Sequence, residues 1–290
     1  MQPNYLMSQF PEALFKTRKE DYAVYESRIQ RGFSTAFSSN LVICGLARDI
    51  RPYISYLYNR ILHLGSFFKD YSVVIVENDS IDGTREELEK IQQTNHRWMI
   101  IGEKQGKIRH CQDKSLRRRI DMAFYRNQYL NFVNAHYGKP LYPDIPTYMI
   151  ILDTDLLGGY SYEGVLNSIG YEQQWDFIGS NGLLFRKRDN RFERLFYDTW
   201  AFRKYGSWND IGKAGNLFLW ERGDEPERVF SCFGGFGIYK WDSIKNLRYN
   251  ETDCDCVTLH KQMIENGQYL FMNPSQITLY NNHQYCSELE

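Results

Sequence analysis

Uniformly apolar runs of strand length alternate with segments of helical length through the first half of the chain. The runs carry no polar residue at every second position, which predicts strands buried on both faces. A strand–helix–strand order of this kind is typical of a parallel, doubly wound sheet. The pattern predicts strands at 41–47, 71–76, 98–101 and 149–152, with helices at about 52–64, 85–93 and 114–137.

The second half is less regular. The pattern there predicts a strand or a strand pair at 175–185 and further strands at 233–239 and 269–272. It also predicts helices at 192–205 and 257–266, and an irregular aromatic segment at 206–223. No linker, repeat or low-complexity stretch divides the chain. Residues 1–40 show weak helical periodicity around 12–31. We therefore expect a single α/β domain, 41–290, with an N-terminal helical arm, 1–40, packed on it.

Two carboxylates end the apolar run at 149–152, in the sequence Asp153-Thr154-Asp155. The glycines at 158 and 159 permit a bend that would bring the two side chains together. Paired carboxylates repel each other unless a cation lies between them, and a hard divalent ion suits oxygen ligands. At the carboxyl end of a parallel sheet such an ion indicates a nucleotide diphosphate site. The alternative is a polar turn after a core strand, since turns favour aspartate.

Composition excludes several classes of partner. The formal net charge of -1 provides no long-range field for nucleic acid, and no apolar stretch approaches the ~20 residues that span a bilayer. Residues 1–19 lack the features of a signal peptide, so we expect a soluble, cytoplasmic protein of unassigned oligomeric state. The aromatic content of 16% suits a core and sugar-stacking surfaces. The six cysteines are scattered. Their spacing favours free buried thiols over a zinc site made by Cys254, Cys256, His260 and His283.

A basic, glycine-containing segment lies between Gly102 and Arg119. It is typical of a solvated loop, and it could also act as a flap that brings positive charge to a diphosphate. In the helix that follows, Arg119 and Arg126 recur at helical spacing and project from one side. Arg126 either forms a surface ion pair or reaches the aspartates and the nucleotide.

Several pieces in this order resemble the glycosyltransferases of the GT-A fold: the first strand ending near Ala47-Arg48, the turn Glu77-Asn-Asp-Ser-Ile-Asp-Gly-Thr84, and Asp153-Thr-Asp155 as an Asp-x-Asp metal motif. The chain is also similar to the capsule-associated mannosyltransferase-like family of fungi, and to chlorovirus glycan-building transferases. The further pieces of that resemblance are Arg119-Ile120 with Ala123, Arg126-Asn127, Ser180-Asn-Gly182, Asp253-Cys-Asp255 and Phe271-Met-Asn-Pro274.

The resemblance implies a metal-dependent glycosyltransferase that uses a nucleotide sugar and Mn²⁺ or Mg²⁺. A UDP-sugar of a pentose such as xylose, or of a hexose, is favoured as donor, and a hydroxyl of a glycan as acceptor. By the same resemblance Asp155 would bind the metal, Asp153 the metal or the ribose, and His283 would be a C-terminal metal ligand. The donor would further contact Ala47, Arg48, Glu77, Asp79, Ser80, Arg126, Thr154 and Gly235.

An inverting enzyme also needs a base for the acceptor hydroxyl. In inverting GT-A enzymes this is an acidic residue at a helix start after a glycine segment, which points to Asp255 first and Asp253 second. An aspartate there could equally be only a helix cap. Aromatic and polar character makes Trp208, Asp210 and Asn181 candidates for the acceptor side. Alternative functions are a retaining GDP-mannose-type mannosyltransferase, a sugar nucleotidyltransferase and a non-catalytic carbohydrate-binding protein.

Overall fold

The computed structural model describes residues 10–110, 114–139, 143–188, 191–212, 215 and 218–280. The helices are η1 (Glu12–Leu14), α1 (Tyr22–Phe37), η2 (Arg51–Tyr53), α2 (Ile54–Gly65), α3 (Thr84–Thr94), α4 (Leu116–His136), α5 (Tyr162–Ile169), α6 (Trp241–Ile244) and α7 (Asp255–Glu265). The strands are β1 (Asn40–Ala47), β2 (Asp70–Glu77), β3 (Trp98–Ile101), β4 (Tyr148–Asp153), β5 (Gly159–Tyr160), β6 (Phe177–Arg188), β7 (Arg191–Phe196), β8 (Arg203–Lys204), β9 (Glu227–Ser231), β10 (Phe236–Lys240) and β11 (Leu270–Tyr280).

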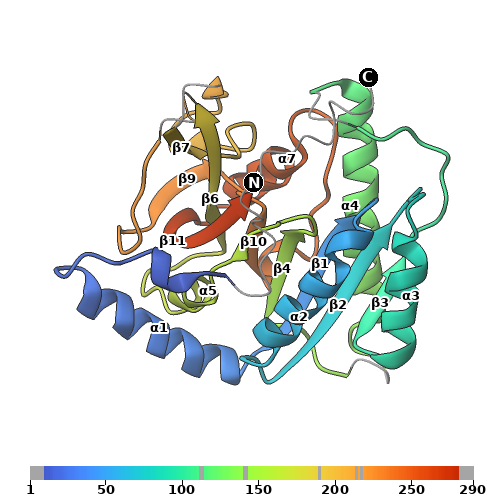
Figure 1. Cartoon of the computed structure of the whole chain (residues 1–290), viewed down its shortest axis with the longest axis horizontal. Coiled ribbons are helices and arrows are strands. Elements are labelled where there is room, and N and C mark those ends of the chain that lie inside the picture. The colour runs from blue at the N-terminus through green and yellow to red at the C-terminus, as the bar shows by residue number, and fades with distance from the viewer. Residues whose placement is uncertain are drawn as a thin grey trace.

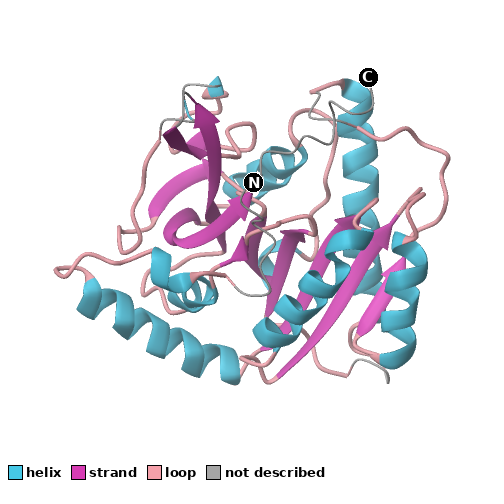
Figure 2. Cartoon of the chain, in the orientation of Figure 1, coloured by secondary structure: helices cyan, strands magenta, loops and turns pink. Residues whose placement is uncertain are grey.

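One central sheet runs through the described part of the molecule in the order β3-β2-β1-β4-β10-β6-β11-β9-β8 (Figures 1 and 2). The first four strands are parallel, β10 is antiparallel to both of its neighbours, and β6 and β11 are parallel to each other. The carboxyl ends of β1, β2 and β4 therefore meet at one edge. Ligands bind at this edge in open α/β sheets.

The sheet separates two apolar layers, because successive residues of a buried strand face opposite sides. Leu41 and Ile43 of β1 face the layer that holds α2, α3 and α5. Val42 and Cys44 face the layer that holds α4 and α7. Burial on both faces is the reason for the uniform apolarity of these strands. α4 runs antiparallel to them, so its first turns lie at the edge where β1, β2 and β4 end (Figure 1).

The N-terminal segment packs against α5 through two glycines. A Cβ on Gly32 of α1 would stand 1.8 Å from the carbonyl oxygen of Leu166, and one on Gly170 would stand 1.9 Å from that of Arg28. The two backbones therefore touch. Arg28, which is 7% exposed, also pairs with Glu172 and Glu225. The helix predicted around 12–31 begins later than expected, at Tyr22, and extends to Phe37.

The strands and helices predicted from β1 to β4 are confirmed to within two residues. The helix predicted at 192–205 is wrong: the segment forms β7, a turn and β8, because β7 pairs with β6 and buries Phe196 against Phe202. The strand predicted at 233–239 begins only at Phe236, since Gly234 and Gly235 adopt left-handed φ angles of 62° and 79°. The last strand continues past Pro274 through a shift of register. No helix in the described ranges has the length and apolarity needed to cross a bilayer.

Candidate functional site

Two adjoining pockets open at the carboxyl edge of the sheet, one of about 260 Å³ and one of about 450 Å³. The smaller, which we call the β1 pocket, lies over the ends of β1, β2 and β4. The larger, which we call the α7 pocket, lies toward the start of α7. Asp155 lines only the β1 pocket and Asp255 only the α7 pocket. The two pockets share a wall made by Arg118, Met122, Arg126, Asp153 and Tyr197.

Asp153 is the last residue of β4, and its carboxylate lies in the shared wall. Burial raises its pKa to about 7, and the nearby charge of Asp155 adds to the effect. The Tyr280 hydroxyl donates to Asp153 Oδ2 at 2.7 Å, and Arg126 Nη2 lies 3.9 Å from Oδ1. Thr154 binds the Leu46 carbonyl oxygen at 2.6 Å and so ties the end of β4 to β1. The two carboxylates therefore lie together at an anchored strand end.

Arg126 connects the two pockets electrostatically. Its guanidinium Nε donates to Asp255 Oδ2, and both side chains are only 7% exposed. Burial opposes ionisation of Asp255, but the charges of Arg126 and then Arg118 outweigh it and hold the pKa of that carboxyl below its usual range. The Arg126 side chain also lies over the rings of Phe233 and Tyr249. Asp255 begins α7, where the positive end of the helix dipole favours its charge.

Gly235, a predicted donor contact, lies beside Asp153 and Tyr280. Its carbonyl oxygen accepts from the Asp153 amide at 2.8 Å. A Cβ at this position would stand 1.8 Å from the Tyr280 hydroxyl oxygen. Tyr280 in turn stacks on Tyr197, with 3.5 Å between ring centroids. The glycine thus leaves room for the tyrosine that holds Asp153.

Most of the polar turn after β2 is engaged in local structure. Glu77 is 2% exposed and pairs with Arg85, while Ser80 accepts from the Asp49 amide. Asp79 has a φ of 53° and accepts from the amides of residues 105, 106 and 107. Arg48 donates to the carbonyl oxygens of residues 107 and 108. Asp79 and Arg48 therefore hold the basic segment over the β1 pocket, and Ala47 and Arg48 line that pocket.

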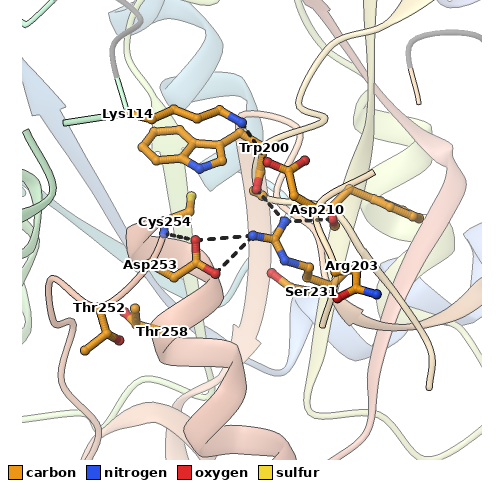
Figure 3. Close-up of polar contacts among 12 residues, drawn as sticks. Lys114, Trp200, Arg203, Asp210, Ser231, Thr252, Asp253, Cys254 and Thr258 are labelled. Carbon is orange, nitrogen blue, oxygen red and sulfur yellow. Dashed lines mark hydrogen bonds and ion pairs between the residues drawn. The ribbon is translucent and has the colours of Figure 1, made fainter. Parts of the chain in front are cut away.

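Asp253, the second candidate base, is held in a different set of contacts. Both of its oxygens accept from Arg203 Nη2, at 3.2 and 3.0 Å, and Arg203 is 2% exposed (Figure 3). Arg203 also donates to the carbonyl oxygens of residues 200 and 202. Asp253 does not line either pocket. The Asp253 carboxylate therefore compensates the charge of the buried Arg203 guanidinium, which in turn holds the turn that contains Trp200.

The three acceptor candidates lie apart from one another. Asn181 is 1% exposed within β6, and Trp208 stacks on Phe230 with 4.7 Å between ring centroids. Asp210 accepts from Lys114 Nζ at 2.7 Å. None of the three is among the residues that line the two pockets. Asp210 contacts two residues that line the α7 pocket, Lys114 and Gly212, whose amide donates to Asp210 Oδ1 at 2.7 Å.

Two residues of the site were missed by sequence reasoning. Asp198 lines the α7 pocket and accepts from the amides of Gly234 and Ala201 at 3.1 and 3.3 Å. Burial raises its pKa, and the charge of Asp255 contributes. Arg118 lies over the Trp200 ring at 4.9 Å and makes no ion pair among the described residues. Asp198 lay in the segment predicted as a helix, and Arg118 was one of many basic residues in its segment.

The donor set at β4 fits a hard divalent cation that takes its remaining ligands from a diphosphate and water. Asp153 and Asp155 supply carboxylate oxygens. The charge of Asp155 raises the pKa of Asp153, and a bound cation would relieve this repulsion between the two carboxylates. Among the described residues, histidines, cysteines and carboxylates do not form a group of three suited to a metal. His283 lies outside the described residues. Cys44, Cys232, Cys254 and Cys256 are free and buried, and His260 bonds to Ser231 and Tyr239.

Comparison with solved structures identifies the fold. The chain superposes on the mannosyltransferase PcManGT from Pyrobaculum calidifontis, in complex with GDP-Man and Mn²⁺, with a TM-score of 0.53 and 12% identity, covering 91% of this chain and 65% of that one. It matches residues 1–349 of S. aureus TarS, in complex with UDP-GlcNAc, with a TM-score of 0.50 and 11% identity, covering 84% and 59%. The fold is that of the GT-A glycosyltransferases. The GT-A-like sheet predicted from the sequence is therefore confirmed.

The chain spans under two thirds of the length of those two structures. No protein-family model matches it, and no curated protein matches it in sequence.

Proposed function

We propose that the chain is a metal-dependent glycosyltransferase that moves a sugar from a nucleotide-sugar donor to a hydroxyl of a glycan acceptor. The observation that carries the proposal is the pair of adjoining pockets with Asp153 and Arg126 in their shared wall. Group transfer needs a donor and an acceptor to meet at a charged boundary. The β1 pocket would hold the nucleotide, and the α7 pocket would hold the transferred sugar and the acceptor.

The donor end of the site would depend on Asp155 and Asp153. These carboxylates would hold Mn²⁺ or Mg²⁺, which supplies positive charge to the diphosphate when bound. We favour a UDP-sugar, of a pentose or hexose, over a GDP-sugar. The fold itself accommodates both, because PcManGT was solved with GDP-Man and TarS with UDP-GlcNAc. Ala47, Arg48 and Thr154 would border the nucleotide.

Two arginines of α4 would stabilise the leaving group. Arg118 and Arg126 lie two turns apart on the face that forms the shared wall. Arg126 is neutralised by Asp255, whereas Arg118 has its guanidinium charge uncompensated by an ion pair in the described residues. Positive charge placed where phosphate charge develops lowers the barrier: one well-placed donor contributes about 2.7–4 kcal/mol, which is roughly a hundredfold to a thousandfold in rate.

The acceptor hydroxyl must lose a proton as the new bond forms in an inverting reaction. We propose Asp255 as the base, because it lies in the α7 pocket across the shared wall from Asp155. Asp198 is a second candidate. It lines the same pocket, its pKa is raised, and no cation pairs with it in the described residues. Asp253 is less suited, because Arg203 occupies both of its oxygens.

A thermal-shift screen of nucleotide diphosphates and nucleotide sugars, with and without Mn²⁺, tests the proposal. A selective ligand stabilises the folded state by about 2.7 kcal/mol at a hundredfold excess over its dissociation constant. We expect a rise in Tm for one nucleotide family, only when Mn²⁺ or Mg²⁺ is present. A nucleotidyltransferase would instead respond to nucleoside triphosphates. A carbohydrate-binding protein would respond to sugars without a nucleotide.

A further inference from the structure

A row of apolar side chains lies exposed on α4 beside the mouth of the β1 pocket. Leu116, Ile120 and Phe124 recur every fourth residue and are 55%, 46% and 44% exposed. Ile108, which lines the pocket itself, is 55% exposed. Residues four apart on a helix share one face. We call these four residues, together with Lys104 and Arg117, the apolar rim.

The apolar character is confined to the part of α4 that reaches the catalytic edge. Farther along the helix, the exposed positions are polar or small, as at Asn131, Asn134 and Ala135. The opposite face of the same first turns carries Arg118 and Met122 into the shared wall. The exposed stripe therefore lies on the outside of the helix whose inside forms the site. Burying a core does not account for it, because these side chains contact solvent.

The rim also carries exposed positive charge, in a chain whose net charge is -1. Residues 102–124 contain seven lysines and arginines against three acidic residues, whereas the whole chain has a net charge of -1. Three of these basic residues are paired with aspartates: Lys107 with Asp121, Arg109 with Asp49, and Lys114 with Asp210. Lys104 and Arg117 are exposed and form no ion pair among the described residues. A helix with exposed apolar side chains and basic neighbours matches the chemistry of an anionic lipid surface, whose headgroups attract the charges while the apolar side chains insert.

The loop that completes the rim is held firmly against α4. Lys107 forms an ion pair with Asp121, and its Nζ lies 5.0 Å from the centre of the Phe124 ring. His110 Nε2 lies 2.8 Å from the other Asp121 oxygen. Asp79 anchors the same loop from the opposite side through three backbone amides. These contacts hold residues 105–107 and 110 in place beside α4, so the described part of the rim is a preformed surface.

A second exposed apolar pair provides an internal comparison. Phe33 and Phe37 of α1 also lie four residues apart and are 46% and 65% exposed. The only basic residue within four positions of either is Arg31, which is paired with Glu172. This pair lacks the free positive charge that an anionic surface would attract. Charge thus distinguishes the apolar rim from the other exposed pair.

We propose that the apolar rim docks this protein on an anionic lipid membrane, with the mouth of the β1 pocket facing the bilayer surface. If the proposed transferase function holds, the orientation favours a glycan acceptor that is itself anchored in the membrane. Membrane docking does not depend on that function. Docking can be measured with protein and lipid alone. A failure of the docking proposal can therefore be told apart from a failure of the proposed transferase function.

Co-sedimentation with vesicles tests the proposal. We expect the protein to bind vesicles that contain phosphatidylglycerol, to bind phosphatidylcholine vesicles weakly, and to be released by salt. The double variant Ile120→Gln/Phe124→Gln and the single variant Arg117→Glu should each lower the partition coefficient about tenfold. The matched double variant Phe33→Gln/Phe37→Gln should bind as the wild type does. Circular dichroism and thermal melts would establish that each variant is folded.

Three outcomes would overturn the proposal. One is equal binding to anionic and neutral vesicles, or to neither. Another is loss of binding in the α1 double variant with full binding retained in the α4 double variant. The third is a wild-type dimer, seen by light scattering, that the α4 double variant converts to a monomer, since the apolar rim would then be an interface between two copies of the chain.

Discussion

Arg126 and Asp255 form a buried ion pair that joins α4 to the first turn of α7. Arg126 Nη2 also lies 3.9 Å from Asp153 Oδ1, so one guanidinium faces both the carboxylate in the shared wall and the Asp255 carboxylate of the α7 pocket. A single charge at this position fixes the spacing between the proposed metal ligands and the proposed base. It also places positive charge where the diphosphate would leave.

Removal of one partner of this pair should be strongly destabilising. Arg126→Met leaves Asp255 buried without its counter-charge, which typically costs about 3–5 kcal/mol in the free energy of unfolding. Urea denaturation followed by circular dichroism measures this. The double variant Arg126→Met/Asp255→Leu should recover part of the loss, because no unpaired charge remains. A double variant less stable than Arg126→Met would contradict this view of the pair.

The two candidate bases can be separated by isosteric variants. Asp255→Asn also leaves Arg126 without its buried counter-charge, so it should be less stable than the wild type. If Asp255 accepts the proton, this variant, assayed at a temperature where it is folded, should retain donor affinity and lose about a hundredfold or more in kcat. Asp198→Asn should then retain most of its turnover. Steady-state kinetics together with calorimetric nucleotide binding distinguish the two. The reverse pattern would make Asp198 the base.

Asp253→Asn serves as the control for those two variants. Its effect should appear in stability, because Arg203 would lose its charged partner. A loss of turnover in a fully stable Asp253→Asn protein would instead indicate that Asp253 takes part in catalysis.

Gly235→Ala should disrupt the metal end of the site. The new Cβ would overlap the Tyr280 hydroxyl, at 1.8 Å, and displace the tyrosine from Asp153. We expect loss of Mn²⁺-dependent nucleotide binding in calorimetry. Gly206→Ala is a matched control, because Gly206 also has a positive φ, 84°, but a Cβ there meets no atom within 4 Å. The control should lose only about 1–2 kcal/mol of stability to backbone strain. Equal nucleotide affinity in the two variants would argue against the role of Tyr280.

His260 should make stability depend on pH. Burial lowers its pKa from 6.5 to about 3, while its ring nitrogens contact Ser231 and Tyr239. Between pH 6.5 and 3, the His260 side chain is therefore protonated in the unfolded chain but neutral in the folded chain. The contribution of neutral His260 to the free energy of unfolding is therefore complete above pH 6.5. It falls by about 1.4 kcal/mol per pH unit as the pH is lowered from 6.5 toward 3. His260→Gln should flatten the dependence in urea titrations over this range. An unchanged slope would show that His260 is not its source.

Sequence patterns predicted the parallel half of the sheet because those strands are buried on both faces. The apolar run that ends at Asp153 is of this kind. The place of Asp153 at the carboxyl edge of the sheet could therefore be predicted from the order of strands and helices along the chain. The pattern was less informative where pairing with a neighbour decides the structure. The charged and apolar residues of 192–205 fit a helical period and a strand period equally well. The pairing of β7 with β6 is what makes residues 191–196 extended.

The candidate site divides in the same way. Asp153, Asp155, Arg126 and Asp255 could be selected from local sequence, and the structure brings Arg126 together with Asp153 and Asp255. The partners of Asp79 could not be foreseen, because they come from the loop after β3. Asp198 was hidden for a similar reason: it enters the α7 pocket through contacts with Gly234 and Ala201 that carry no sequence signature.

Calorimetric titration of a nucleotide diphosphate in the presence and absence of Mn²⁺, for the wild type and Asp155→Ala, tests the central claim most directly. We predict metal-dependent binding of UDP, or of GDP, to the wild type. In Asp155→Ala that binding should be lost while the far-ultraviolet circular dichroism spectrum stays the same. Equal nucleotide affinity in the two proteins, with Mn²⁺ present, would contradict a metal-bound diphosphate at the end of β4.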